Sequence, residues 1–222
     1  MEEAKAHAGE AAAALVEDGM RIGLGTGSTV RYTLLALSRR IAAGLHVIGI
    51  PTSLQTERLA HQLGIPLTDF SATRRLDLDI DGADEIDPGL CLIKGGGGAL
   101  LREKLVALAS ERVVIVADES KCVPVLGSFH LPVEIVPFAW QTTAERICQI
   151  GATCTLRQIA STPFQTDNGN YMLDCDFGPI DAPQKLHEKL KLLPGVVETG
   201  LFCEIASMAI IGHEHGIRTV GK

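Results

Sequence analysis

Four consecutive glycines, Gly95–Gly98, constrain the fold of this chain more than any other feature of its sequence. A glycine run loses much backbone entropy on folding and packs no side chain, so it suits places where side chains would obstruct a close approach. Lys94 precedes the run, and the helix-forming segment after it contains Glu103. Because the N–H groups and dipole of a helix N-terminus favour anions, the sequence predicts an anion-binding loop here, with Glu103 as a candidate proton carrier.

The first half of the chain alternates short apolar segments with helix-forming segments. Strands are expected at 20–24, 45–50, 76–81, 90–93 and 112–117, and helices at 2–17, 29–42, 53–63 and 99–110. Strand, glycine-rich turn, helix and strand in this order are typical of a parallel sheet with right-handed crossovers. The fold class predicted for this part is therefore α/β, with a Rossmann-like parallel sheet.

After Gly127 the pattern changes. Strands are expected at 131–138, 153–159, 170–177 and 196–202, and helices at 142–150 and 184–193. The order β-α-β-β-α-β is that of the split βαβ unit of ferredoxin-like domains. The sequence predicts a Rossmann-like catalytic domain from 1–127 plus 206–222, and an inserted α+β ferredoxin-like domain from 128–205. Short apolar runs near the C-terminus are expected to return to the first sheet.

The charge and the cysteines limit the partners and the compartment expected for the chain. The net charge is −7 at pH 7 and no basic run occurs, so the electrostatic footprint of a nucleic-acid binder is missing. The N-terminus lacks the features of a secretory signal, and no apolar run approaches the length of a membrane span. The cysteines form no CxxC pair and are expected to be free thiols in the cytoplasm: Cys91, Cys122, Cys148, Cys154, Cys175 and Cys203.

The segment Gly25–Thr29 forms a turn between a predicted strand and a predicted helix, the position where open α/β sheets bind ligands. Its N–H groups and hydroxyls suit a phosphate, although a plain connection with Ser28 or Thr29 as N-cap would use the same residues. The third glycine of a dinucleotide fingerprint is absent, and no Lys-Ser/Thr pair completes a Walker A motif. Nucleotides are disfavoured, and no cofactor is expected.

Asp81 and Asp84 lie at the end of a predicted strand and in the acidic turn that follows. The segment 77–82 opens like a calcium loop, but its twelfth position is Pro88, where a bidentate glutamate is needed, so calcium is rejected. The two aspartates are expected either to bind sugar hydroxyls and move protons, or to provide ordinary Asx-turn contacts. The run His213–His215 has no third ligand in view, and no metal is expected.

Glu103, Lys94 and Lys121 are the remaining charged candidates. A glutamate early in a helix commonly complements the helix dipole, whereas neighbouring aspartates would raise its pKa toward that of a general base. Each lysine follows the end of a predicted strand, and both are expected at the same edge of one sheet. Such a pair suits a phosphate, although most lysines are solvated surface residues.

Four motifs occur in order along the chain: GLGTGST, DGADEID, KGGGGALLREK and ADESK. Together they closely resemble the ribose-5-phosphate isomerases of the A type. The resemblance extends to LPVEIVPFA, TDNGNYMLD and LPGVVETGLF in the second half, so it covers nearly the whole chain.

The resemblance implies an aldose–ketose isomerase of the non-oxidative pentose phosphate pathway. Such an enzyme interconverts D-ribose 5-phosphate and D-ribulose 5-phosphate without a metal, and is commonly a homodimer, sometimes a tetramer. The resemblance implies Glu103 as the proton acceptor, and the chemistry of the reaction adds Asp81, Asp84 and Lys94 as expected catalytic residues. The implied substrate-binding residues are Thr26, Gly27, Ser28, Thr29, Asp81, Gly82, Ala83, Asp84, Lys94, Gly95, Gly96, Gly97 and Lys121.

The chemistry expected of these residues starts from Glu103, which would move a proton between C1 and C2 through a cis-enediolate. Lys94 and the glycine amides would stabilise the enediolate. Asp81 would open the sugar ring and Asp84 would orient its hydroxyls, and these two roles could be exchanged. The phosphate would be held mainly by Gly25–Thr29, with help from Lys121.

Two other functions use the same fold group. A non-enzymatic sugar-phosphate sensor would need no general base, and would usually carry a DNA-binding segment, for which little room is expected before the first strand. A CoA transferase would use a glutamate as nucleophile, and the chain is short for that task. The isomerase is the favoured hypothesis.

Overall fold

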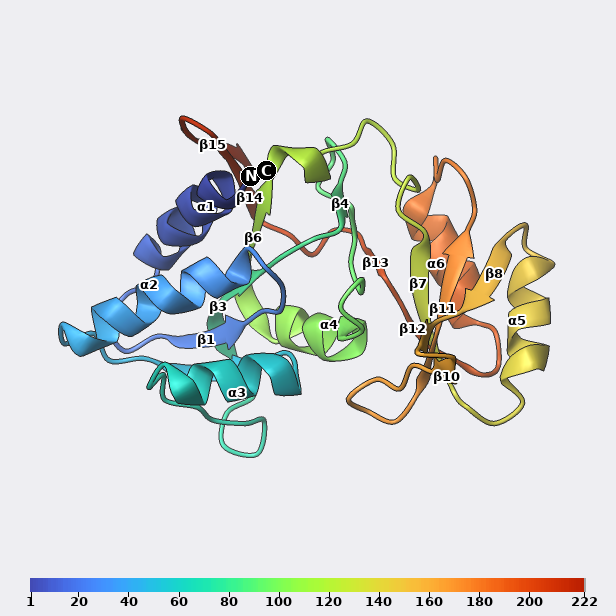
Figure 1. Cartoon of the computed structure of the whole chain (residues 1–222), viewed down its shortest axis with the longest axis horizontal. Helices are drawn as coiled ribbons and strands as arrows, with labels where there is room; N and C mark the ends of the chain where they lie inside the picture. The colour runs from blue at the N-terminus through green and yellow to red at the C-terminus, as the bar shows by residue number, and fades with distance from the viewer. Residues whose placement is uncertain (222) are drawn as a thin grey trace. The chain divides into compact units, whose positions relative to one another are not determined.

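The computed structural model describes residues 1–221, which divide into two compact units (Figure 1). The first, called the α/β unit, comprises Met1–Ala83, Arg102–Cys122 and the described residues from Glu204 onward. The second, called the α+β unit, comprises Asp84–Leu101 and Val123–Cys203. The chain therefore passes between the two units four times.

A six-stranded sheet in the order β15-β14-β6-β3-β1-β2 forms the centre of the α/β unit. Its strands are β1 (Arg21–Leu24), β2 (Ile48–Pro51), β3 (Leu76–Asp81), β6 (Ser110–Asp118), β14 (Met208–His213) and β15 (Gly216–Gly221). All neighbouring pairs are parallel except β14 with β15, which is antiparallel. The α/β class is confirmed. The sheet is mixed and mostly parallel, and β14 and β15 at one edge come from the C-terminal part of the chain.

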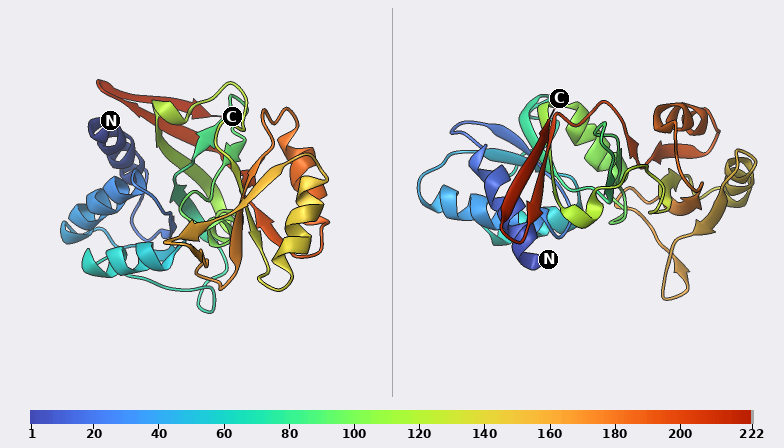
Figure 2. Two further views of the ribbon diagram at one scale, coloured as in Figure 1. Left: turned by 45° about the vertical axis from the view of Figure 1, so that its right-hand side comes forward. Right: turned by 90° about the horizontal axis from the view of Figure 1, so that it is seen from above.

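The helices are α1 (Glu2–Ala14), α2 (Val30–Ala42), α3 (Leu54–Gln62), α4 (Leu100–Leu108) and a 3₁₀ turn at Glu119–Lys121. The α1 helix lies beside α2 and the hairpin β14–β15, as Figures 1 and 2 show. Thr29 occupies the N-cap position of α2, but its side chain makes no capping hydrogen bond. Ser53 does cap α3, since its hydroxyl accepts the Thr56 N–H at 3.0 Å.

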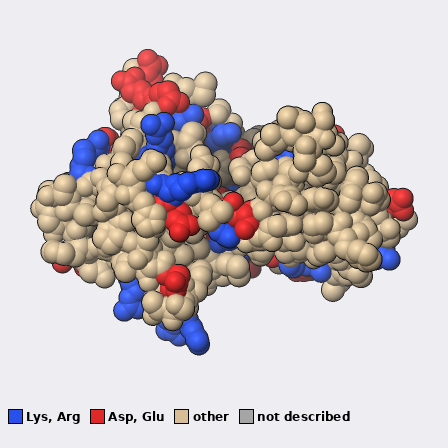
Figure 3. Space-filling view, turned by 60° about the horizontal axis from the view of Figure 1, so that its bottom comes forward, with Lys and Arg blue, Asp and Glu red and all other residues tan. Residues whose placement is uncertain are grey.

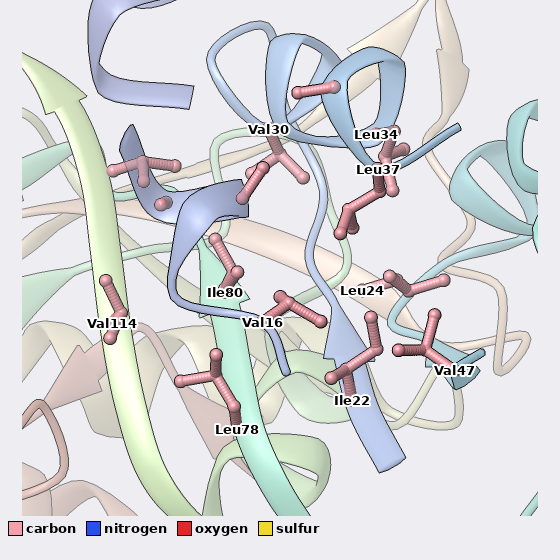
Figure 4. Packing of buried hydrophobic residues seen from close by; sticks show 14 of the residues in the cluster. Val16, Ile22, Leu24, Val30, Leu34, Leu37, Val47, Leu78, Ile80 and Val114 are labelled. Atoms are coloured by element: carbon pink, nitrogen blue, oxygen red, sulfur yellow. The ribbon is translucent and has the colours of Figure 1, made fainter. Parts of the chain in front are cut away.

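The core of the α/β unit lies between its sheet and the α1 and α2 helices (Figure 4). Ile22, Leu24, Leu78 and Ile80 point from β1 and β3 toward side chains such as Leu34 and Leu37 of α2. The strand over 76–81 has one apolar face, formed by Leu76, Leu78 and Ile80, and its polar face is buried as well. Asp79 and Asp81 on its other face are 0% and 1% exposed, because β3 is a central strand between β1 and β6.

The α+β unit contains a four-stranded antiparallel sheet in the order β12-β7-β11-β8. Its elements follow one another as β7 (Leu131–Ile135), α5 (Trp140–Cys148), β8 (Thr153–Leu156), β11 (Tyr171–Asp176), α6 (Pro183–Lys191) and β12 (Val196–Thr199). Ile147 of α5 and Leu190 of α6 pack into one core with Val133 and Leu173 of the sheet. The predicted order β-α-β-β-α-β is therefore present.

Two smaller sheets complete the α+β unit. One pairs β9 (Gln158–Ile159) with β10 (Thr162–Pro163), and the other has the order β13-β5-β4. Its strands are β4 (Glu85–Ile86), β5 (Leu92–Ile93) and β13 (Leu201–Phe202). The compact units thus differ from the predicted domains at 84–101, because β5 pairs with β13 rather than with the six-stranded sheet.

The pairing of β5 with β13 also places Cys91 opposite Cys203, and the two form a disulfide. The prediction that all cysteines are free thiols is wrong for these two, because residues separated by 112 positions become neighbours across the strands. Cys122, Cys148, Cys154 and Cys175 are free. Among residues 1–221, no helix combines the length and apolar character that crossing a membrane requires.

Candidate active site

The turn Gly25–Thr29 follows β1 and leads into α2, at the carboxyl end of the parallel strands. The Thr26 N–H donates to Asp81 Oδ1 at 2.9 Å, and the Gly82 N–H donates to the same oxygen at 2.7 Å. A side chain at Gly25 would meet the Cα of Asp81 at 2.5 Å, so only glycine fits. The sequence predicted both segments as site residues, and the structure brings them together.

Buried hydroxyls hold the same turn from the side of α3. The Thr26 hydroxyl lies 2.8 Å from the hydroxyls of Thr52 and Ser53 and 3.1 Å from that of Thr56. Thr56 also donates to the Gly25 carbonyl at 2.8 Å. This cluster was not predicted from the sequence, although a serine such as Ser53 before a helix-forming run is a recognisable N-cap. The turn is therefore fixed by short bonds on two sides.

A hollow of about 310 Å³ opens beside this turn in the α/β unit. Its lining includes Gly25, Gly27 and Ser28 from the turn, Arg31 from α2, and Gln55 from α3. Arg31 is a cation that the sequence analysis did not single out, because a single arginine on a helix is usually a solvated surface residue. The N–H groups at the start of α2 and Arg31 favour an anion in this hollow, whereas Glu2, which also lines it, disfavours one.

The buried acids of the α/β unit include Glu103 of α4 and Asp81 of β3. Glu103 is 5% exposed and Asp81 is 1% exposed, which is unusual for carboxylic acids without a specific role. Lys121 ends the 3₁₀ turn after β6 and is half-buried. Asp118 precedes that turn and caps it by accepting the Ser120 N–H at 3.1 Å.

The glycine loop, defined as Lys94–Gly98, belongs to the α+β unit and follows β5. The Gly96 N–H donates to Asp84 Oδ2 at 2.7 Å, and the Gly98 N–H donates to the Gly95 carbonyl at 2.9 Å. Gly95 and Gly98 have φ values of 100° and 81°, in the left-handed region that favours glycine. Gly96 and Gly97 are exposed, whereas Gly95 and Gly98 are buried.

Lys94 is 3% exposed and lies over the ring of Phe202, with Nζ 5.5 Å from the ring centroid. Its backbone N–H donates to Gly200 at 2.9 Å. The prediction that Lys94 and Lys121 share the edge of one sheet is wrong, because Lys94 follows a strand of the sheet β13-β5-β4 while Lys121 follows β6. The short strand β5 carries too little pattern to reveal which sheet it joins.

Arg157, directly after β8, is a second residue that the sequence analysis missed. Its Nη1 donates to the carbonyls of Gly95 and Gly96 at 2.9 and 3.1 Å. Nothing in the sequence signals this contact, because the partners lie more than 60 positions apart.

The remaining acids of the acidic turn have structural partners within the α+β unit. Glu85 accepts the N–H groups of Gly127 and Phe129 at 2.7 and 2.6 Å, and Asp87 accepts the Gly89 N–H in an Asx turn. Among residues 1–221, no group of three or more His, Cys, Asp or Glu side chains is arranged to hold a metal. Figure 3 shows Lys and Arg side chains in separate small groups on the face drawn, close to acidic ones.

A family model described as ribose 5-phosphate isomerase A (phosphoriboisomerase A) matches residues 48–216. A curated relative from Bacillus mycoides, named ribose-5-phosphate isomerase A, is 54% identical over 212 residues, which are 95% of this chain and 96% of the relative.

Two solved structures are similar over the whole chain. The ribose 5-phosphate isomerase of Plasmodium falciparum is 40% identical with a TM-score of 0.97, and the match covers 100% of this chain and 99% of that one. A D-ribose-5-phosphate isomerase in complex with phospho-erythronic acid is 36% identical with a TM-score of 0.96, at the same coverage.

Proposed function

The chain belongs to the ribose 5-phosphate isomerase A family and is an isomerase of ribose 5-phosphate, and we propose that Glu103 is its general base. The reaction interconverts D-ribose 5-phosphate and D-ribulose 5-phosphate. Glu103 takes the proton from C2 of the aldose, and the electron pair forms a cis-enediolate. The resulting carboxylic acid returns the proton to C1 while the proton of the C2 hydroxyl passes to O1, which gives the ketose and restores the carboxylate. Atoms and charges balance without an outside reactant.

The observation that carries this proposal is the burial of Glu103 in a chain whose whole length matches isomerases. A carboxylate that only complemented the helix dipole would gain nothing from being 5% exposed. Burial removes water that would compete for the proton and strengthens each electrostatic contact with the reacting carbons.

The other site residues take their proposed roles from their positions in each unit. We propose that the phosphate binds at Thr26–Thr29 with Lys121, supported by the N–H groups at the start of α2 and by Arg31 in the hollow beside them. Asp81 moves the hydroxyl proton when the sugar ring opens, with Gly82 and Ala83 beside it.

In the α+β unit, we propose that Lys94 and the glycine loop stabilise the enediolate, and that Asp84 orients substrate hydroxyls. The Gly96 N–H donates to Asp84, so the enediolate contact is assigned to amides of Gly95 or Gly97 instead.

An isomerase assay with ribose 5-phosphate, with and without EDTA, tests the activity and the proposed absence of a catalytic metal together. We expect ribulose 5-phosphate to form at the same rate in both conditions. A folded protein that binds ribose 5-phosphate but forms no product would favour the alternative function, a non-enzymatic sugar-phosphate sensor.

The Glu103→Gln variant tests the mechanism. We expect kcat to fall by about 10²–10⁴, the usual contribution of a general base, while the fold and the binding of phospho-erythronic acid are kept. Glu111→Gln, at an exposed glutamate of β6, is the matched control and should keep the parent kcat. A fully active Glu103→Gln protein would refute the assigned base.

Three further assignments remain proposals of the same kind. We propose a homodimer, with a tetramer as the alternative. We also propose a cytoplasmic location. The disulfide removes one argument for that location, because disulfides persist mainly in oxidising compartments. We also propose that the α+β unit is a ferredoxin-like split βαβ domain inserted into a Rossmann-like one. Its strand order β12-β7-β11-β8 supports this class.

A further inference from the structure

The side chain of Arg157 contacts the glycine loop at the loop's backbone carbonyls. Its Nη1 donates to the carbonyls of Gly95 and Gly96 at 2.9 and 3.1 Å. The guanidinium thus bridges two consecutive peptide groups of the loop. The planar, permanently charged guanidinium holds both peptide groups because its N–H donors have a fixed geometry, which a more flexible side chain does not provide.

The guanidinium is itself fixed by two neighbours within the α+β unit. Asp174 of β11 pairs with it through both carboxylate oxygens, with Nε to Oδ2 at 3.0 Å and a second bond from Nη2 to Oδ1. The ring of Phe164 lies 5.7 Å from the guanidinium carbon, and a side chain at Gly98 would collide with the same ring. Arg157 is therefore a constrained group, since its side chain is only 16% exposed.

These contacts determine the direction of the loop amides. The peptide between Gly95 and Gly96 is bound at both ends, because its carbonyl accepts from Arg157 and its N–H donates to Asp84. The peptide between Gly96 and Gly97 is bound only through its carbonyl. The peptide is trans, so the Gly97 N–H points away from the guanidinium, on the opposite edge of the same plane.

We propose that Arg157 is a positioning residue of the isomerisation, which fixes the Gly96–Gly97 peptide so that the Gly97 N–H faces the developing enediolate oxygen. The inference rests on the proposed function and gives the α+β unit a part in it. Glycine peptides rotate easily, so the run that admits the substrate needs an outside group to set the orientation of its amides. Donors fixed before the reaction stabilise developing charge without reorganising.

The first test compares kcat and KM of Arg157→Lys with those of the parent. Lysine keeps the charge but cannot bridge two carbonyls and pair with both oxygens of Asp174. We expect kcat to fall about 10- to 100-fold, the effect of a small misplacement in an active site, while KM changes less than about threefold. The turn Gly25–Thr29, to which we assign the phosphate, lies in the other unit and keeps its own contacts.

Lys191→Ala is the matched control. Lys191 also joins a carboxylate and a backbone carbonyl in the α+β unit, through Glu198 at 3.0 Å and the Val197 carbonyl, but it does not contact the glycine loop. We expect its kcat to stay near that of the parent even if the unit unfolds at a lower temperature. A kcat of Arg157→Lys within about twofold of the parent, or a fall matched by Lys191→Ala, would overturn the proposal.

The second test is chemical rescue of Arg157→Ala by millimolar guanidinium chloride. A surface hollow lined by Gly96, Ser128, Phe129, His130 and Asp174 reaches Arg157, so a free guanidinium ion has access to the vacated place. We expect kcat to rise with guanidinium and to level off, while sodium chloride has no such effect and the parent is not activated. A merely stabilising arginine would show no such recovery.

The outcomes separate this inference from the function on which it rests. Parent activity is measured first, and its absence would refute the proposed function and this inference with it. An active parent with an unaffected Arg157→Lys variant refutes the positioning role alone. A loss of kcat that guanidinium does not reverse, in a variant with the parent's circular dichroism spectrum, would make Arg157 structural and also overturn the proposal.

Discussion

The turn Gly25–Thr29 and the glycine loop Lys94–Gly98 are both rich in glycine, yet they are held in different ways. Uncharged hydroxyls and one carboxylate oxygen surround the turn, all from elements of its own sheet and the adjacent α3. The loop depends on a guanidinium from a distant segment and on Asp84. The conformation of the turn is therefore set by the strands and helix next to it. The conformation of the loop depends on one long side chain, which can be substituted without changing core packing.

Alanine substitutions in the turn and in the glycine loop are expected to differ most in their effect on the free energy of unfolding. Gly25→Ala should cost about 1–3 kcal/mol of unfolding free energy and most of the activity, because its Cβ would meet the Cα of Asp81 at 2.5 Å. At Gly96 the Cβ would meet only the carboxylate of Asp84, at 2.5 Å, which can turn away. Gly96→Ala should therefore lose activity but stay within about 0.5 kcal/mol of the parent.

Urea denaturation and the isomerase assay measure both quantities for each variant. An unfolding free energy of Gly96→Ala as low as that of Gly25→Ala would contradict the difference described here between the loop and the turn. That result would mean that the glycine loop, like the turn, is specified by its backbone path.

The disulfide Cys91–Cys203 is the next feature to test, because it ties down the strand that leads into the glycine loop and has no counterpart at the turn. Cys203→Ser should destabilise the α+β unit by about 2–4 kcal/mol, since the bond closes a long loop. The only tryptophan, Trp140, lies in α5 of that unit, so its fluorescence in urea reports the change.

Cys148→Ser, at an exposed free cysteine of the same unit, is the control. Dithiothreitol should reproduce the effect of Cys203→Ser in the parent and have no effect on the variant. Equal urea midpoints with and without dithiothreitol would show that the bond contributes nothing.

A smaller effect is expected when one hydroxyl beside the turn is removed. Thr56→Val deletes the donor to the Gly25 carbonyl and leaves that buried carbonyl without this bond, at a cost of about 1–3 kcal/mol. Thr155→Val, at an exposed position of β8, should change little. Thermal unfolding followed by circular dichroism compares the two, and equal shifts would argue that the hydroxyl cluster does not hold the turn.

The smallest effect on activity is expected at the free cysteines of the α+β unit. The pKa of Cys154 is lowered to about 7, first because the Cys175 thiol donates a hydrogen bond to it, and burial only partly opposes this. Burial raises the pKa of Cys148, although that thiol is exposed enough to react. Cys154 should therefore react with iodoacetamide with a midpoint near pH 7, and Cys148 only at higher pH.

Mass spectrometry of peptides alkylated at a series of pH values gives both midpoints. Alkylation of Cys154 should leave kcat unchanged, since this thiol has no contact with the glycine loop. A Cys154 midpoint in the ordinary range for a thiol, or one that Cys175→Ala does not raise, would contradict the assigned hydrogen bonds.

The parts of the site that could be predicted from sequence are those encoded over a few consecutive residues. Gly25–Thr29 is flanked by an apolar strand and a helix, so its place at the end of β1 follows from local pattern. Asp81 follows from the end of a strand in the same way. The proposal of Glu103 as general base came from its position early in a helix after the glycines, together with the family resemblance.

What could not be predicted depends on contacts between distant segments. Arg157 reaches the glycine loop across more than 60 positions, and the disulfide joins residues 112 positions apart. Lys94 was assigned to the wrong sheet because β5 has only two residues, too few to show a periodicity. In each case the missing information is a contact between distant segments, which a single sequence does not encode locally.

The hairpin β14–β15 has a consequence for the order in which the α/β unit can be completed. The α1 helix packs against β14, and a side chain at Gly212 would collide with the Ala4 backbone. β14 also pairs with β6 in the six-stranded sheet. Because the α+β unit lies between α1 and β14 along the chain, synthesis makes all of that unit before α1 gains this partner. We expect this contact between distant segments to form late in folding.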